Sequence, residues 1–170
     1  MNNNQILLQK RSPEKKHHPN KWALCSGHVE AFDDSFEAAA VRELNEELGL
    51  IVSKEELRLI DTKEVTDSDN NVHITKYYNY YTNKNENEFV LQEEELSEVK
   101  WYNINTVINM MEREDDSIVF SNKMLELLKK ININEEDLYG YLTMLNNYKP
   151  NKNMDLSLYL NMNLNKALSV

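Results

Sequence analysis

The spacing of apolar residues along the chain predicts strands on both sides of one strong helix. Short apolar, β-branched or aromatic runs predict strands at residues 6–9, 57–65, 73–83 and 98–104, and residues 22–31 are predicted as a strand leading into a turn. Later segments repeat apolar residues at helical spacing, at residues 105–114, 121–131 and 135–148. Strands, one helix, more strands and then helices predict an α/β (α+β) layered domain rather than a regular βαβ series.

The clearest helix is expected at residues 35–48. Its buried stripe is predicted at apolar positions three and four residues apart, namely Val41, Leu44 and Leu48. Asp34 is a suitable N-cap, and Glu37, three residues later, would complete a capping box. Gly49 stands where helices often end, because glycine readily adopts the left-handed conformation.

The C-terminal part contains a second alternating pattern. Residues 154–164 alternate apolar and mostly polar residues, which predicts a half-buried strand, although an Asn-rich tail without regular structure is the alternative. The first predicted strand begins almost at residue 1, so either the true start lies upstream or another segment covers the edge of the sheet, because an exposed edge strand is a hazard. We hypothesise that residues 154–164 pair with this edge. We expect one domain, with residues 1–130 as its main part and residues 131–170 as its helical and extended extension.

The composition narrows the class of protein. The chain has 170 residues, 41% of them hydrophobic, which suffices for one domain with a core. Its apolar runs are short and its start lacks a signal-peptide pattern, so we expect no membrane segment and a cytoplasmic location. The net charge of −10 argues against general nucleic-acid binding. A single cysteine, Cys25, excludes an internal disulfide.

Three glutamates crowd negative charge onto one strip of the predicted helix, namely Glu43, Glu46 and Glu47. Residues three and four apart are neighbours on a helix surface, and like charges there repel by roughly 0.2–0.5 kcal/mol per pair. Solvent and Arg42 can offset this repulsion, or a cation can bind there. Hard cations such as Mg²⁺ and Mn²⁺ prefer carboxylate and carbonyl oxygens, so the strip is a candidate metal site.

The segment from Gly27 to Leu50, GHVEAFDDSFEAAAVRELNEELGL, resembles the sequence box of the Nudix family. The pattern of that family is G, five residues, E, seven residues, then R-E-U-x-E-E-x-G-U, where U is a bulky aliphatic residue. The second half matches in full, at Arg42, Glu43, Leu44, Glu46, Glu47, Gly49 and Leu50. The first half is one residue longer than the pattern, so either Asp33 or Asp34 replaces the first glutamate. The resemblance extends over residues 5–129.

The resemblance implies a Nudix fold, in which a mixed β-sheet is sandwiched between α-helices. It also implies metal-dependent hydrolysis of a diphosphate bond in a nucleoside diphosphate-linked small molecule, by attack of water at phosphorus. The implied cofactor is Mg²⁺ or Mn²⁺, and its implied ligands are Gly27, Glu43, Glu46, Glu47 and Glu94. Glu94 belongs to the acidic run 93–95, any member of which could supply the last carboxylate.

The implied catalytic residues are Glu43, Glu46 and Arg42, with Glu43 favoured as general base and Arg42 orienting a carboxylate. The basic, aromatic run before the box offers Lys21 and Trp22 for substrate binding, and His28 follows the opening glycine. An ordinary surface loop with a packed tryptophan is the alternative interpretation of this run. A homodimer is compatible with the sequence.

Two other functions compete with hydrolysis. The opening region looks closest to the isopentenyl diphosphate isomerase-like branch of Nudix hydrolases. In the isomerase a catalytic cysteine directly precedes the glycine-histidine pair, whereas here Ser26 holds that place and Cys25 lies one residue earlier. We therefore do not expect isomerase chemistry. A Nudix module that binds nucleotides without cleaving them is the second alternative, but the box retains all its glutamates after Arg42. The substrate itself stays open.

Overall fold

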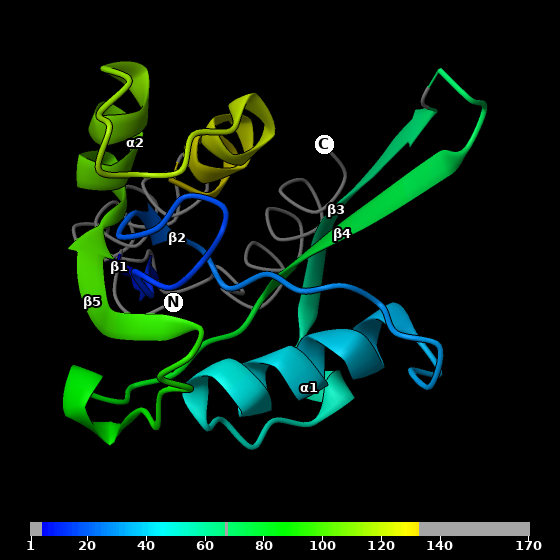
Figure 1. Ribbon diagram of the computed structural model, residues 1–170, viewed down its shortest axis with the longest axis horizontal. Coiled ribbons are helices and arrows are strands. Elements are labelled where there is room, and N and C mark those ends of the chain that lie inside the picture. The colour runs from blue at the N-terminus through cyan, green and yellow to red at the C-terminus, as the bar shows by residue number, and fades with distance from the viewer. Residues whose placement is uncertain (1–4, 67, 133–170) are drawn as a thin grey trace, which may run out of the picture. The chain divides into compact units, whose positions relative to one another are not determined.

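The computed structural model describes residues 5–66 and 68–132 of the chain (Figure 1). The chain divides into two units, residues 1–132 and residues 133–170, and all described residues belong to the first. The predicted helix at residues 135–148 and the alternating segment 154–164 lie outside the described residues. Within the described part of the chain, no helix is long and apolar enough to span a bilayer.

A three-stranded antiparallel sheet forms the centre of the described unit. Its strands are β1 (Gln5–Arg11), β2 (Trp22–Ala23) and β5 (Leu96–Asn103), in the order β2-β1-β5. β1 pairs with β5 along its whole length, whereas β2 pairs only with Gln9 and Lys10. Of residues 22–31, predicted as a strand leading into a turn, only the first two form a strand.

A second sheet contains the strands β3 (Arg58–Thr66) and β4 (Val72–Asn79), which pair as a long antiparallel hairpin (Figure 1). The mixed α+β class is confirmed, but the described strands are divided between two antiparallel sheets, where the sequence predicted one mixed sheet. Most side chains of β3 and the first half of β4 are exposed. Few apolar contacts therefore tie the hairpin to the other strands.

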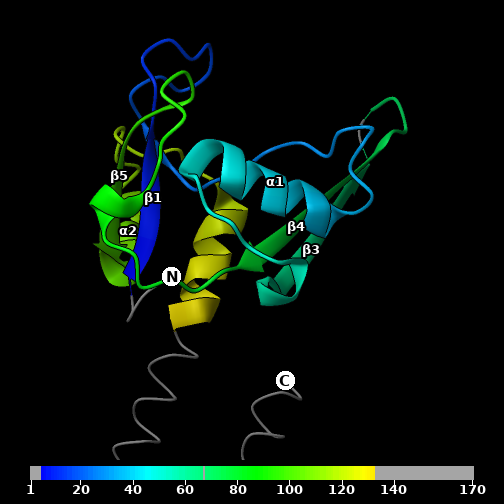
Figure 2. The same ribbon diagram turned by 90° about the horizontal axis from the view of Figure 1, so that it is seen from below.

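Helices cover both faces of the three-stranded sheet, as the sequence predicted. The helices are α1 (Phe36–Leu48), α2 (Ile104–Glu112) and an unlabelled helix at residues 122–132. Successive side chains of a strand point to opposite faces. In β1, Leu8 packs in a cluster with residues of α2, whereas Leu7 packs in a cluster with residues of α1 (Figure 2). Two short 3-10 turns, η1 (Lys54–Glu56) and η2 (Glu86–Glu88), complete the described elements.

Helix α1 begins one residue later than its predicted cap. Its N-cap is Ser35, whose hydroxyl accepts a hydrogen bond from the backbone N–H of Ala38 at 3.1 Å. Asp34 is instead paired with Lys54. The predicted capping box does not form because the residue three positions after the observed cap is Ala38, while Glu37 accepts a hydrogen bond from a tyrosine of β4. The predicted caps were therefore wrong at the N-terminus, where long-range partners compete with local ones.

The C-terminal end of α1 follows the prediction. Gly49 has a φ of 64°, in the left-handed region, and its N–H donates to the carbonyl of Asn45 at 2.9 Å. A Cβ at this position would also lie 2.6 Å from the side chain of Val90. Of the predicted stripe, Leu48 is buried and the other two residues are half-buried.

Substitution of Leu8 tests the central position of β1, because its side chain is completely buried in the cluster that contains residues of α2. We expect Leu8→Ala to lower the free energy of unfolding by about 2–5 kcal/mol, from lost burial and the cavity left behind. The matched control is Ile51→Ala, whose side chain is 93% exposed. It should change stability by less than about 0.5 kcal/mol. Urea unfolding of both variants measures the difference, and equal losses would contradict this core assignment.

Candidate functional site

Arg42 connects the loop before α1 to the carboxylates on α1. Its Nε and Nη2 donate to the two carboxylate oxygens of Asp33, at 3.2 and 3.0 Å. Its Nη1 donates to Glu43 Oε1 at 2.8 Å and to Glu46 Oε2 at 2.9 Å, and Nη2 also donates to the carbonyl of His28 at 2.8 Å. A guanidinium has five N–H donors, and these contacts use all five. Arg42 therefore positions the loop and two carboxylates, with no donor left over for a substrate.

Asp33, rather than Asp34, stands against Arg42. The Asp33 side chain is only 4% exposed, and its hydrogen bonds from Arg42 lower the pKa of this carboxyl below its usual value. Asp34 is exposed and pairs with Lys54 at 2.6 Å. The extra residue of the box therefore lies between Asp33 and the start of α1.

Gly27 lies directly against the carboxylate of Glu43. A Cβ built at Gly27 would lie 1.9 Å from the Glu43 carboxyl carbon and 2.1 Å from Oε1. No side chain fits at that distance, so this position needs glycine unless the glutamate moves. The structure thus brings together two of the predicted ligands, one from the loop before the helix and one from α1.

Glu47 faces the sheet and is buried. Its Oε2 accepts hydrogen bonds from Gln9 Nε2 at 2.8 Å and from Cys25 Sγ at 3.2 Å. Burial raises the pKa of Glu47 above its usual value, in spite of these two hydrogen bonds. Burial and the adjacent Glu47 charge also hold the pKa of the Cys25 thiol well above its usual value. Cys25 therefore stays protonated, which is unsuited to a nucleophilic or acid-base thiolate.

Gln9 is the functional candidate that the sequence did not reveal. It occupies an inward position of β1 and is 3% exposed, yet it is one of several polar residues of that strand and nothing in the local sequence singles it out. Its Oε1 has no hydrogen-bond partner among the described residues. A buried polar atom of this kind is rare in folded proteins and needs an explanation.

The acidic run 93–95 contributes unevenly. Glu94 is exposed, and its role as a metal ligand stays a prediction. Glu95 is half-buried, forms an ion pair with Lys15, and its negative charge contributes to the raised pKa of Glu47. Within this run, Glu95 is therefore the residue whose charge acts on Glu47 of the box.

The predicted substrate-binding residues are held in other contacts. Lys21 forms an ion pair with Asp116 at 2.5 Å. Trp22 is half-buried and packs edge-to-face on Tyr102, with ring centroids 5.4 Å apart. His28 is exposed, and its backbone carbonyl is one of the five acceptors of the guanidinium described above. The alternative interpretation of a packed tryptophan therefore agrees with the structure.

The predicted metal ligands fit a hard cation in their chemistry but are not gathered into a cage. Among residues 5–66 and 68–132, no group of three or more His, Cys, Asp or Glu side chains is placed to hold a metal ion. Arg42 holds Glu43 and Glu46, while Gln9 and Cys25 hold Glu47 at the buried edge of the same strip. A cation would have to compete with these partners for the carboxylate oxygens.

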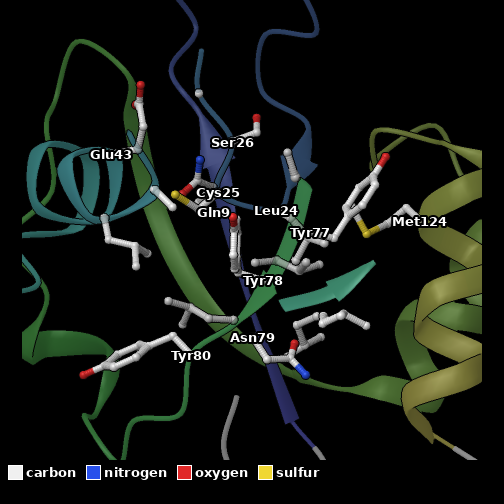
Figure 3. Close-up of a pocket in the computed structure, with 18 of the residues that line it drawn as sticks. Gln9, Leu24, Cys25, Ser26, Glu43, Tyr77, Tyr78, Asn79, Tyr80 and Met124 are labelled. Carbon is white, nitrogen blue, oxygen red and sulfur yellow. The ribbon is translucent and has the colours of Figure 1, made fainter. Parts of the chain in front are cut away.

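A cavity of about 430 Å³ opens beside the carboxylates. Its walls come from β1, α1, β4 and the helix at residues 122–132, and its lining is mainly apolar and aromatic. Figure 3 shows Gln9 and Cys25 in this cavity together with Tyr77 and Tyr78 of β4. Glu43 also lines it, so the cavity is continuous with the acidic side of α1.

Comparisons with known proteins agree with the box. The family model described as NUDIX domain matches residues 1–122. Nudix hydrolase 3 of Arabidopsis thaliana is 32% identical over 126 residues, which are 68% of this chain and 16% of that protein. The chain thus spans less than a fifth of the length of this curated relative.

The fold is also that of a solved structure. The Nudix domain of Shewanella oneidensis NrtR, in a cocrystal with ADP ribose, has a TM-score of 0.51 and 20% identity. That match covers 74% of this chain and 76% of the other. A MutT/nudix family protein from Enterococcus faecalis has 25% identity and a TM-score of 0.46, over 58% of this chain and 36% of that one.

The pH dependence of stability tests whether the contact between Asp33 and Arg42 holds the loop against α1. Its pKa is lowered in the folded chain by Arg42, so its stabilising contribution is complete above its unfolded pKa of about 3.9. That contribution is lost as the pH falls through the lower, folded pKa. We expect Asp33→Asn to destabilise the metal-free protein at pH 7, with the difference from wild type disappearing toward pH 2. Urea unfolding across pH measures it. The control, Asp34→Asn, changes an exposed ion pair and should lose less at pH 7; an equal loss would contradict the assignment.

Proposed function

The chain belongs to the Nudix family, and from this membership we propose that it hydrolyses a diphosphate bond in a nucleoside diphosphate-linked small molecule. Water would attack at phosphorus, with a divalent cation bound at the box. The observation that supports this proposal is the arrangement around Arg42, which holds Asp33, Glu43 and Glu46 while Gly27 lies against Glu43. Nucleotide-linked pyrophosphate hydrolysis is the general activity associated with this family.

Nudix hydrolases generally use a divalent metal ion, and we propose Mg²⁺ or Mn²⁺ for this chain. The residues that would hold it are Glu43, Glu46, Glu47 and the backbone carbonyl of Gly27, because hard cations prefer oxygen donors. When bound, the cation would neutralise charge on the diphosphate and lower the pKa of a bound water. The close approach of Gly27 to the Glu43 carboxylate supports this ligand set, since it places the backbone of the loop beside a carboxylate of α1.

Glu43 is our choice for the general base. Arg42 binds its Oε1, and within the described residues its Oε2 accepts no hydrogen bond and is available for a proton. Glu43 also lines the cavity, where the rest of a substrate would lie. Arg42 has the positioning role, because it keeps Oε1 fixed through an ion pair at 2.8 Å. Glu46 shares that guanidinium and is half exposed, which leaves it accessible to a cation.

Several predictions from the sequence remain predictions for the whole protein. They are the cytoplasmic location, the absence of general nucleic-acid binding, the homodimer and the position within the isomerase-like branch. Isomerase chemistry itself gains no support from the site, because Cys25 donates to Glu47 and is held protonated.

Turnover with a substrate panel tests the hydrolase. The panel contains nucleoside triphosphates, nucleotide sugars, ADP-ribose, NADH, dinucleoside polyphosphates and isoprenoid diphosphates. The nucleotide, phosphomonoester and pyrophosphate products formed with Mg²⁺ or Mn²⁺ are separated by chromatography and quantified. We expect turnover of at least one nucleotide-type compound, abolished by EDTA. Glu46→Gln should lower kcat/KM by about tenfold or more, since it removes one negative oxygen donor from the cation. The control is Glu55→Gln, an exposed glutamate on η1.

The control should keep wild-type kcat/KM, which shows that a lost charge alone has no effect. If no compound of the panel is hydrolysed while the folded protein still binds nucleotides, the hydrolase proposal is wrong and a module that binds nucleotides without cleaving them is supported. Turnover of isoprenoid diphosphates alone would overturn the nucleotide-linked substrate class.

Gly27 provides a separate test of the geometry. A methyl group at this position would overlap the end of the Glu43 side chain, which can move aside, so Gly27→Ala should leave the unfolding temperature nearly unchanged. Turnover should nevertheless fall by about 10²-fold, because a displacement of about 1 Å in a reacting group can cost that much. Steady-state kinetics and thermal unfolding measure the two effects. Full activity in this variant would show that Glu43 does not need its observed position.

A further inference from the structure

The outer edge of β3 is open in the described part of the chain. Across residues 5–66 and 68–132, β3 pairs with β4 and with no other strand. Most of its side chains are exposed, including the apolar Leu59 and Val65. Figure 1 shows the hairpin reaching away from the three-stranded sheet. An exposed edge is a template for a further strand, and a two-stranded sheet is only marginally stable by itself. The hairpin would therefore be stabilised by a strand added along β3.

Both faces of the hairpin are already in contact with helices near its base. Successive side chains of a strand point to opposite faces, so Asp61 and Tyr78 lie on different faces of this sheet. Asp61 forms an ion pair at 2.6 Å with Lys123 of the helix at residues 122–132. On the other face, the hydroxyl of Tyr78 donates a hydrogen bond to Glu37 of α1. A partner would therefore meet the hairpin along an edge.

We propose that β3 pairs antiparallel with β3 of a second copy of this chain, about a twofold axis that passes through Thr62. In this arrangement Thr62 lies opposite Thr62 of the partner subunit. Asp61 lies opposite Lys63 of the partner subunit, and the symmetry repeats this contact once. The two hairpins then form one four-stranded sheet, in which the two β3 strands are central. The inference does not depend on the proposed hydrolysis.

The charges along β3 favour this register. Thr62 is the midpoint of the nine-residue strand Arg58–Thr66, so a twofold axis there pairs the strand along its full length. It also places opposite charges, Asp61 and Lys63, directly across from each other, which stabilises a pair of strands. A shift of the axis by one residue in either direction would place Asp61 opposite Asp61, or Lys63 opposite Lys63, which is destabilising. Larger shifts shorten the paired segment. The strand is thus complementary to itself in one register.

The contacts of Asp61 leave room for this partner. Its Oδ1 accepts a hydrogen bond from the backbone N–H of Thr62 at 2.8 Å, while its Oδ2 binds Lys123. Pairing would give the Thr62 N–H a backbone carbonyl of the second copy and release Oδ1 for Lys63 of the partner subunit. The register shift between Leu59 and Asp61 interrupts the regular ladder, so we expect a dimer that dissociates at micromolar concentrations.

Sedimentation velocity of the full chain tests the interface. Between about 1 and 200 μM, we expect the wild type to pass from monomer to dimer. Lys63→Glu should weaken dimerisation by about tenfold or more, because both opposite-charge pairs become like-charge pairs. The matched control is Lys16→Glu, an exposed position in the loop between β1 and β2. It changes the net charge by the same amount and should dimerise like the wild type.

A mixture of two charge variants tests the register itself. Asp61→Lys alone should also weaken dimerisation, because it places two lysines opposite each other. An equimolar mixture of the Lys63→Glu and Asp61→Lys chains should dimerise again, since every position 61 then faces an opposite charge at position 63. Sedimentation velocity of the mixture, compared with each chain alone, measures this recovery.

Cross-linking keeps the test decisive if Asp61→Lys does not fold. Thr62→Cys places a thiol on the twofold axis, so mild oxidation should link two chains. Thr66→Cys is the control, because in this register it lies about 27 Å from its own copy, at 3.4 Å per residue. The wild-type chain, which contains Cys25 as its one cysteine, is the blank.

Four results would overturn the inference. The wild type could stay monomeric at every concentration, whatever then covers the edge of β3. Lys63→Glu could dimerise as well as the wild type, or Lys16→Glu could lose the dimer equally, which would make net charge the cause. Finally, Thr66→Cys could cross-link as readily as Thr62→Cys, which would exclude this register. None of these measurements involves a cation or turnover, so they are independent of the hydrolase test.

Discussion

The arrangement of the site depends on the charge of Arg42. Residues 27–33 have no helix or strand of their own, and the hydrogen bonds of this guanidinium to Asp33 and to the His28 carbonyl attach them to α1. The same guanidinium lowers the repulsion between Glu43 and Glu46, which are three residues apart on the helix. Loss of its charge would leave the buried Asp33 carboxylate unpaired and remove the contact that holds Gly27 near Glu43. One residue thus couples the loop conformation to the carboxylate geometry.

The box glutamates lie in different environments, and this difference bears on cation binding. Glu46 is half exposed and held by Arg42, whereas Glu47 is buried and held by Gln9 and Cys25. Burial raises the pKa of Glu47, so keeping that carboxylate ionised lowers the stability of the folded chain. A cation would offset this cost and the mutual repulsion, but it would have to displace hydrogen bonds from Arg42 and Gln9. The affinity for the cation therefore equals the gain from relieving the burial cost and the repulsion, less the cost of the displaced hydrogen bonds.

Local patterns in the sequence predicted the elements of the fold but not their partners. The spacing of apolar residues predicted α1 and its end at Gly49, because both depend on neighbours within a few residues. The choice between Asp33 and Asp34 could not be made, since it depends on Lys54, which lies 20 residues from Asp34. Gln9 was missed because its partner Glu47 is 38 residues away. The division of the strands into two sheets is likewise a property of long-range packing, which apolar alternation in one strand does not report.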